Sequence, residues 1–240
     1  TTTGHSNVSL GNTTLCKNVT GTRNVGIGLS ALFNTLEDSN TAIGASAMAA
    51  NTTGEYNVAV GDNSLTTNIS ADRNTAVGFE SLKVNTTGTS NVAVGSEALD
   101  ANTTASYNTA IGKSSLTDNT TGAANTAVGF SALKTNTEGA NNVAMGCGAL
   151  CLSTTGAGNN AIGMNAGRLT TGGANVAVGH SALEDNTSGA SNTALGREAL
   201  HTNTTASNNV AVGKRALYLN TTGTTNTAVG QNSLHSNNSF

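Results

Sequence analysis

The chain of 240 residues contains no proline and no tryptophan, and only four phenylalanines and three tyrosines. So few large rings cannot fill the core of an ordinary globular domain, although the regular valine, isoleucine and leucine residues exclude plain disorder. Charged residues make up only 10% of the chain, and the formal net charge is −3. Because there is no basic cluster and no aromatic platform, the composition excludes nucleic acid as a predicted partner.

Long apolar runs and frequent cysteines are missing as well. No stretch approaches the roughly 20 apolar residues of a membrane span, and no signal-peptide pattern is present. The three cysteines, Cys16, Cys147 and Cys151, are too few for a disulfide framework and lack the spacing of a zinc site. Cys147 and Cys151 belong to one repeat unit and could pair; otherwise the thiols are free. The redox compartment therefore stays open.

What the chain does contain is a repeat. Asn, Val or Thr, Ala, an aliphatic residue and Gly recur in this order, as in Asn57–Gly61. We number the columns of the unit from this first Asn. The fourteen units begin at residues 7, 24, 40, 57, 74, 91, 108, 125, 142, 159, 175, 192, 209 and 226, so eleven intervals are 17 residues long and two are 16.

A period below 20 residues is too short for the helix pairs of helical repeats and matches one coil of a β-solenoid. We therefore expect an all-β fold, a parallel β-solenoid or β-roll with fourteen coils of 16–17 residues, that occupies 1–240 as a single repeat domain. The chain begins partway through a coil, and neither 1–6 nor 235–240 resembles a helical or charged cap. Because uncapped ends invite pairing, we expect a segment of a longer fibre.

The alternation of a strand predicts which columns form the core. Column four is aliphatic in every unit and is expected to point inward, and a second short strand is expected to carry the leucines of column nine. The predicted core residues are Val60, Val77, Val94, Ile111 and Val128 in column four and Leu82, Leu99 and Leu116 in column nine. The alanines of column three either pack closely against another subunit or merely keep the coil thin.

Glycine and the two shortened units mark special backbone. Column five is Gly in all fourteen units, which indicates a positive φ or a close approach of the backbone. The 16-residue units follow Gly28 and Gly163, and in the second one Gly167 replaces the leucine of column nine. We expect a kink, a tightened turn or a local bulge at these two places.

Column twelve offers two interpretations. Ten units carry Asn-x-Thr/Ser in this column, which is the acceptor pattern for N-glycosylation. Stacked asparagine side chains that bond to one another and to the turn backbone would explain the same column. Asn136 favours the ladder, because its unit keeps the Asn although Glu138 removes the acceptor pattern. The ten residues are Asn18, Asn51, Asn68, Asn85, Asn102, Asn119, Asn186, Asn203, Asn220 and Asn237.

No arrangement of residues supports catalysis or cofactor binding. The four histidines lie in scattered columns without a recurring acidic partner. Gly112-Lys113-Ser114 lacks the upstream glycine of a phosphate loop, since Tyr107 stands there. Calcium-binding β-rolls need a regular Asp column, which is absent. We expect no catalytic, cofactor or metal site, and no enzyme.

The pentad, as in Asn74–Gly78 and Asn125–Gly129, resembles the repeats in the heads of YadA-like trimeric autotransporter adhesins. It is also similar to Asn-Thr-Ala-Val-Gly arrays in phage tail fibres. The resemblance covers essentially the whole chain, but the unit is longer than that of adhesin heads. It implies a left-handed parallel β-roll that forms a homotrimer, as a non-enzymatic fibre or adhesin module attached to a host surface, a matrix or a sugar.

Such a module would lie outside the cell, on a cell or virion surface, without membrane insertion. Two alternatives remain. The first is a structural filament subunit, possibly coated with glycans and associated head to tail. The second is an ice-binding protein with regular ranks of threonine; the adjacent threonines after column twelve count against it, because successive strand residues point to opposite faces.

Overall fold

The computed structural model describes residues 3–237, so five residues of the two terminal segments lie outside the described part. The chain divides into two compact units, Thr1–Thr121 and Gly122–Phe240. The described residues form fourteen strands of three residues each and no helix, so none that could cross a membrane. The first unit contains β1 (Val8–Leu10), β2 (Val25–Ile27), β3 (Thr41–Ile43), β4 (Val58–Val60), β5 (Thr75–Val77), β6 (Val92–Val94) and β7 (Thr109–Ile111).

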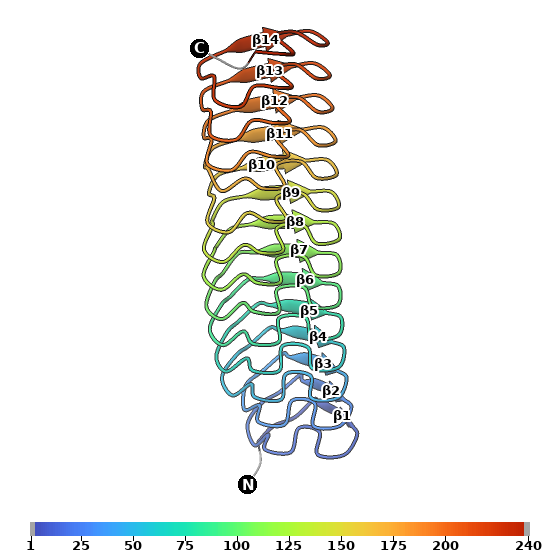
Figure 1. Ribbon diagram of the computed structural model, residues 1–240. Coiled ribbons are helices and arrows are strands. Elements are labelled where there is room, and N and C mark those ends of the chain that lie inside the picture. Colours follow the sequence, from blue (N-terminus) through green and yellow to red (C-terminus); the bar gives the residue numbers. More distant parts are fainter. Residues whose placement is uncertain (1–2, 238–240) are drawn as a thin grey trace. The chain divides into compact units, whose positions relative to one another are not determined.

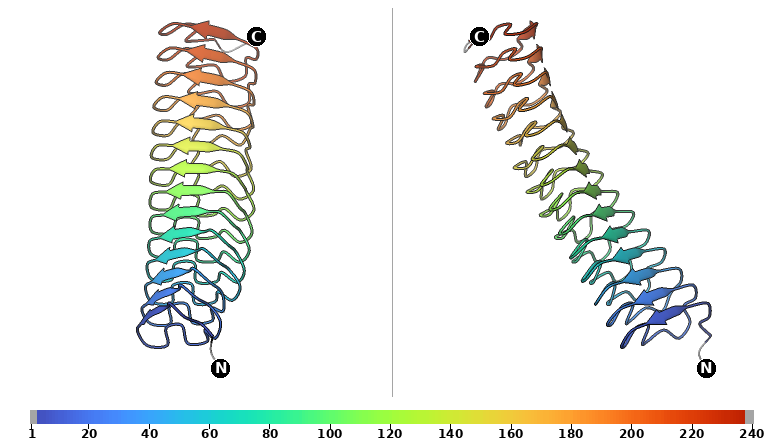
Figure 2. Two further views of the ribbon diagram at one scale, coloured as in Figure 1. Left: turned by 180° about the vertical axis from the view of Figure 1, so that it is seen from behind. Right: turned by 90° about the vertical axis from the view of Figure 1, so that its right-hand side faces the viewer.

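The second unit contains β8 (Thr126–Val128), β9 (Val143–Met145), β10 (Asn160–Ile162), β11 (Val176–Val178), β12 (Thr193–Leu195), β13 (Val210–Val212) and β14 (Thr227–Val229). Within each unit, consecutive strands lie side by side and point the same way (Figures 1 and 2).

The register pairs each residue with its equivalent in the next repeat, as in Ala59 with Ala76 and Val60 with Val77. The predicted fold class, an all-β parallel solenoid with one coil per repeat, is confirmed.

The interior of each coil lies between the alanines of column three and the leucines of column nine. Ala76 and Ala93 are 0% exposed, and so are Leu82, Leu99 and Leu116. The two columns face each other, because a Cβ added at Gly26 in column three would lie 3.4 Å from Leu15 Cγ in column nine. The large leucine side chains of column nine therefore pack against the small alanine methyl groups of column three and fill the interior of the coil.

The placement of column four in the core is wrong. Val60, Val77, Val94 and Val128 are only half-buried, and Ile111 is 40% exposed. A three-residue strand turns columns two and four to one side and column three to the other. In so thin a coil the inner side has room only for alanine, so the larger β-branched residues lie outside. For the same reason, the alanines of column three do not face another subunit.

The segment that carries the leucines is a turn, so the expected second strand is also wrong. Leu82 has φ of 49° and Glu80, two residues earlier, has φ of 55°. Left-handed backbone costs a non-glycine residue about 1–2 kcal/mol. A hydrogen bond from the Leu82 N–H to the Ala98 carbonyl in the next coil, 3.0 Å long, helps to offset this cost. Left-handed backbone at every second residue, as at Glu80 and Leu82, bends the turn segment that closes each coil.

The glycine of column five allows neighbouring coils to approach closely. Gly61 has φ of 136°, and a Cβ at this position would lie 2.4 Å from the Gly78 carbonyl oxygen. A side chain here would therefore be strained in conformation and would also clash with the next coil. The expectation of a positive φ at this column is confirmed.

The two short units tighten a turn and leave the strand register intact. β2 pairs with β3, and β10 pairs with β11, in the same register as the other strands. Asn24 donates to Glu37 O and Asn159 to Gly172 O, 13 residues on, whereas the equivalent bonds elsewhere span 14 residues. The turn that precedes the accepting carbonyl, Glu37 O or Gly172 O, is therefore one residue shorter in these two units.

The revised core makes a direct prediction about stability. Leu99→Ala removes a fully buried side chain and should lower the free energy of unfolding by about 2–5 kcal/mol. Val77→Ala removes a half-buried side chain outside the coil and should cost less than about 1.5 kcal/mol. Denaturant melts followed by circular dichroism give both values. A larger loss for Val77→Ala would contradict the assignment of inside and outside.

Candidate interaction surface

Column twelve is a ladder of buried side-chain amides. Asn102 Nδ2 donates to Asn85 Oδ1 at 2.9 Å, and Asn85 Nδ2 donates to Asn68 Oδ1 at 3.2 Å. Each amide also donates to the carbonyl three residues on, as Asn102 does to Ala105 O at 3.0 Å. The members that are 0% exposed are Asn51, Asn68, Asn85, Asn102, Asn119, Asn136, Asn186, Asn203 and Asn220.

This burial decides against a glycan at those nine positions in the folded chain. A sugar on the Nδ2 atom would displace the bonds to the neighbouring coil and would need space that the interior lacks. Asn18 and Asn237, near the two ends of the described chain, are half-buried. The ladder that Asn136 favoured is therefore present.

Column one forms a second ladder, which the sequence analysis did not identify. The backbone N–H of Asn91 donates to Asn74 Oδ1 at 2.9 Å, and Asn91 Nδ2 donates to Ala105 O at 2.9 Å. Because Asn102 also donates to Ala105 O, one carbonyl joins the two ladders. The invariance of the first Asn in every unit was the available signal.

Threonines after the column-twelve Asn serve the same stacking. Thr86 Oγ1 donates to Thr103 O at 3.0 Å, and Thr187 Oγ1 donates to Thr204 O at 2.8 Å. The protons of these hydroxyls are therefore used in bonds to the next coil. The asparagines of columns one and twelve, with the threonines that follow column twelve, thus join each coil to the next by hydrogen bonds.

The outer side of the strands is different, because it is apolar. We call the side formed by columns two and four the strand face. Column two is Val or Thr except at Asn160, and column four is aliphatic or Met throughout. Leu10 is 66% exposed, Met145 41% and Ile162 43%. None of the ten Lys and Arg or thirteen Asp and Glu residues lies in a strand.

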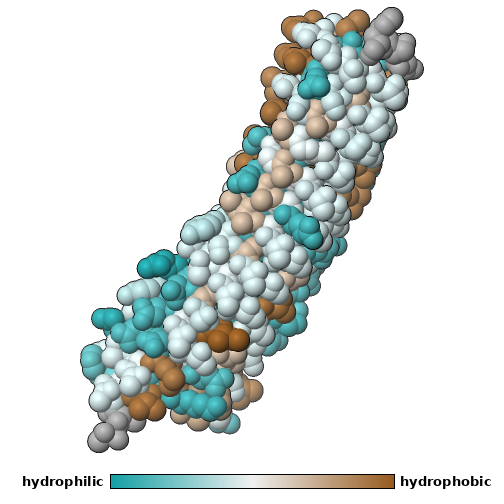
Figure 3. Space-filling model, turned by 90° about the vertical axis from the view of Figure 1, so that its left-hand side faces the viewer, coloured by the Kyte–Doolittle hydropathy of each residue, from teal (hydrophilic) through white to brown (hydrophobic). Residues whose placement is uncertain are grey.

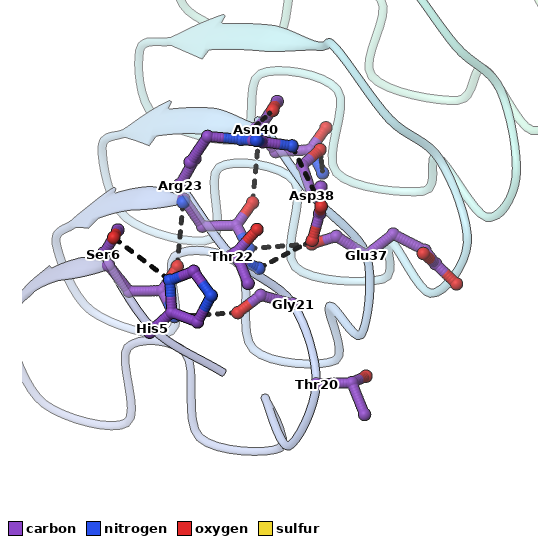
Figure 4. A network of polar contacts seen from close by, with 12 residues as sticks. His5, Ser6, Thr20, Gly21, Thr22, Arg23, Glu37, Asp38 and Asn40 are labelled. Atoms are coloured by element: carbon purple, nitrogen blue, oxygen red, sulfur yellow. Dashed lines mark hydrogen bonds and ion pairs between the residues drawn. The ribbon is translucent and has the colours of Figure 1, made fainter. Parts of the chain in front are cut away.

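The charged residues gather in the variable columns, and several bridge neighbouring coils. In the first unit, Asp38 accepts a hydrogen bond from the Thr22 N–H at 2.7 Å and pairs with Arg23 at 3.0 Å (Figure 4). The bond from Thr22, with the Arg23 charge, lowers the pKa of Asp38. In the second unit, the bond from Arg215 and then that from Arg197 lower the pKa of Glu198.

Column ten of the second unit holds a stack of rings. The His201 and Tyr218 rings lie 5.1 Å apart, and the Tyr218 and His235 rings 5.2 Å apart. His201 Nε2 also lies 3.5 Å from Glu184, which pairs with Arg168 at 3.1 Å. Residues one coil apart thus stack or alternate in charge.

Exposed aromatic residues occupy the columns that flank the strand face. Phe79 and Phe130 in column six are 47% and 56% exposed, and Tyr56 and Tyr107 in column seventeen are 51% and 68% exposed. On the side drawn in Figure 3, pale residues of intermediate hydropathy predominate, and strongly hydrophilic or hydrophobic side chains are scattered among them. A shallow groove in the first unit is lined by Ser30, Phe33, Asn34, Ala49, Ala50, Thr66 and Thr67.

No group of three or more His, Cys, Asp or Glu residues within 3–237 is arranged to hold a metal ion. Cys147 and Cys151 are not joined by a disulfide there, and Cys16 and Cys147 are exposed. The chain matches no protein-family model, and no curated protein matches it. The proposal for its function below is therefore based on the surface features described above.

The Asn ladder predicts a large effect of a small change. Asn102→Asp replaces a buried amide by a carboxylate that cannot donate to Asn85 or Ala105, and should destabilise the chain by about 1–3 kcal/mol. Asn208→Asp, at an exposed position, is the matched control and should change stability little. Equal melting of the two variants would refute the ladder as a stabilising element.

Asp100 generates a prediction with a defined pH dependence. Its Oδ1 is buried without a hydrogen-bond partner among the described residues, and burial raises the pKa of Asp100 above the usual 3.8. A raised pKa means that the fold favours the protonated carboxyl, so stability falls as the pH rises through the raised pKa.

Asp100→Asn should therefore be more stable than the natural chain at pH 7. The difference should shrink when the pH falls below about 3.8, where the natural carboxyl is protonated in both the folded and unfolded states. Denaturant titrations at pH 7 and pH 3 measure it. Lower stability of Asp100→Asn at pH 7 would show that the carboxylate has a favourable partner.

Proposed function

We propose that the chain is a non-enzymatic module of an extracellular fibre or adhesin, displayed on a cell or virion surface. Copies of the chain associate, as a homotrimer, and the solenoid presents its variable residues to a host surface, a matrix or a glycan. A structural filament without a receptor is the alternative.

One observation carries this proposal, namely the division of roles between invariant and variable columns. The Asn of columns one and twelve, the Ala of column three, the Gly of column five and the Leu of column nine serve the bonds and the packing between coils. The variable columns carry the charged and aromatic side chains on the outside. A stack of identical coils with changing outer residues suits a scaffold for surface contacts.

The resemblance of the pentad to adhesin heads and tail fibres supports the same class of function. Attachment would rely on side chains that give large contact area at low cost in conformational entropy. Tyrosines are frequent among such residues in interfaces. Tyr56 and Tyr107, which occupy column seventeen of the first unit and are more than half exposed, are the best candidates.

Attachment can be tested with the receptor unknown. Beads coated with the chain are passed over arrays of immobilised glycans and matrix proteins, and retained beads are counted. The double variant Tyr56→Ser, Tyr107→Ser should reduce retention on the positive surface at least tenfold, as expected for the loss of about 1.4 kcal/mol or more. Ser90→Ala, in the same column, is the matched control and should not change it.

If no surface retains the coated beads better than uncoated beads, the attachment role is wrong and the structural filament is favoured. If retention is unchanged in the double variant but lost on heating, attachment resides in other columns.

A further inference from the structure

The strand face has the composition of an interface that is open in the single chain. Its outer residues are valine, threonine, isoleucine, leucine and methionine, with Asn160 as the only amide in column two. The end strands show the largest exposure, with Leu10 at 66% and Val229 at 68%. A contiguous exposed apolar surface that continues from strand to strand commonly marks an interaction site.

Charged residues begin immediately beside the strand face. Column six carries Asp62, Lys113, Arg197 and Lys214, and column seventeen carries Arg23 and Arg73. An apolar centre depleted of charge, bordered by a polar rim with exposed aromatic residues, is the usual anatomy of a protein–protein interface.

The periodicity of the strand face identifies the occupant. Neighbouring strands lie about 4.8 Å apart, so rows of outer side chains recur at this distance. Only a surface with the same rise can place its side chains between these rows at every coil. A second copy of this chain has that rise by construction, as in the interdigitated sheets of steric zippers.

The threonines of column two fit this occupant as well. Thr41, Thr75 and Thr109 are half-buried residues of the strand face, whereas threonine hydroxyls near column thirteen donate to carbonyls of the next coil. A facing threonine of another copy would supply a partner, so the polar atoms would not be buried unpaired.

We propose that copies of this chain associate through their strand faces, which is the surface that joins the subunits of the proposed fibre module. This inference rests on the proposed function and names the contact on which it depends. Seven strands of about 10 Å, spaced by about 4.8 Å, give each unit roughly 340 Å² of projected strand face. This is somewhat under half of the roughly 800 Å² that each partner buries in a stable interface, and the exposed aromatic residues of columns six and seventeen enlarge the contact area of each unit.

Light scattering on the full chain tests the assignment. The natural chain should be an oligomer at micromolar concentration, and Val94→Lys should reduce its mass to that of one chain, because burying an unpaired ammonium at the contact is unfavourable. Val84→Lys, the same change at a half-buried position in column eleven, should leave the oligomer intact. Circular dichroism melts establish that both variants fold.

A second measurement examines the contact itself. This measurement uses a background in which Cys16, Cys147 and Cys151 are changed to Ser. The thiol of Val94→Cys should react with a maleimide at least tenfold more slowly in the oligomer than in the same variant diluted until it consists of single chains. The thiol of Val84→Cys should react equally fast in both. Equal protection at the two positions would overturn the proposal, and so would a natural chain that is monomeric.

The two proposals fail in different ways. A monomeric natural chain that still attaches to a surface would overturn the strand-face contact and leave attachment standing. An oligomer that Val94→Lys dissociates, but whose beads bind no surface, would support the contact and overturn attachment.

Discussion

The constraint on which the structure depends is that each residue stacks on its own equivalent in the neighbouring coil, one strand spacing away. A side chain is tolerated in an interior column only if it can bond to or pack against a copy of itself. The asparagine amide, which has both a donor and an acceptor, satisfies this condition through bonds such as that from Asn102 to Asn85. Leucine and alanine satisfy it by packing. A charge cannot, so charged residues lie in the other columns, where Glu198, although buried, pairs with Arg197 and Arg215.

The same constraint explains why much of the fold is predictable from the sequence. The period fixes one coil per unit, and equal spacing fixes the strand register. The leucines of column nine are buried, as Leu82 and Leu99 show. Asn136, which remains where the glycosylation pattern is lost, points to the ladder. These features depend on repetition, which a single sequence displays fourteen times.

The features that could not be predicted depend on the cross-section of one coil, which repetition does not specify. Alternation shows that columns two and four share a side, but not which side is inner; size favoured Val77 and Val94, and the thin coil accommodates Ala76 and Ala93 instead. A left-handed leucine such as Leu82 contradicts its intrinsic preference and is held by the next coil. The column-one ladder needs knowledge of which carbonyl lies opposite, and that follows only from the folded turn.

The ladder of column twelve has a gap in the second unit, where Ser153 and Thr170 replace asparagine in successive coils. The Ser153 hydroxyl is buried without a partner among the described residues, and the Leu column also lacks a side chain at Gly167. Two cohesive elements are thus weakened at adjacent coils. Local opening begins where such contacts are fewest. We therefore expect amide hydrogens around 153–170 to exchange with solvent sooner than those beside the ladder that runs without a gap from Asn51 to Asn119 in the first unit. The interior of the second unit would then open first at these two coils.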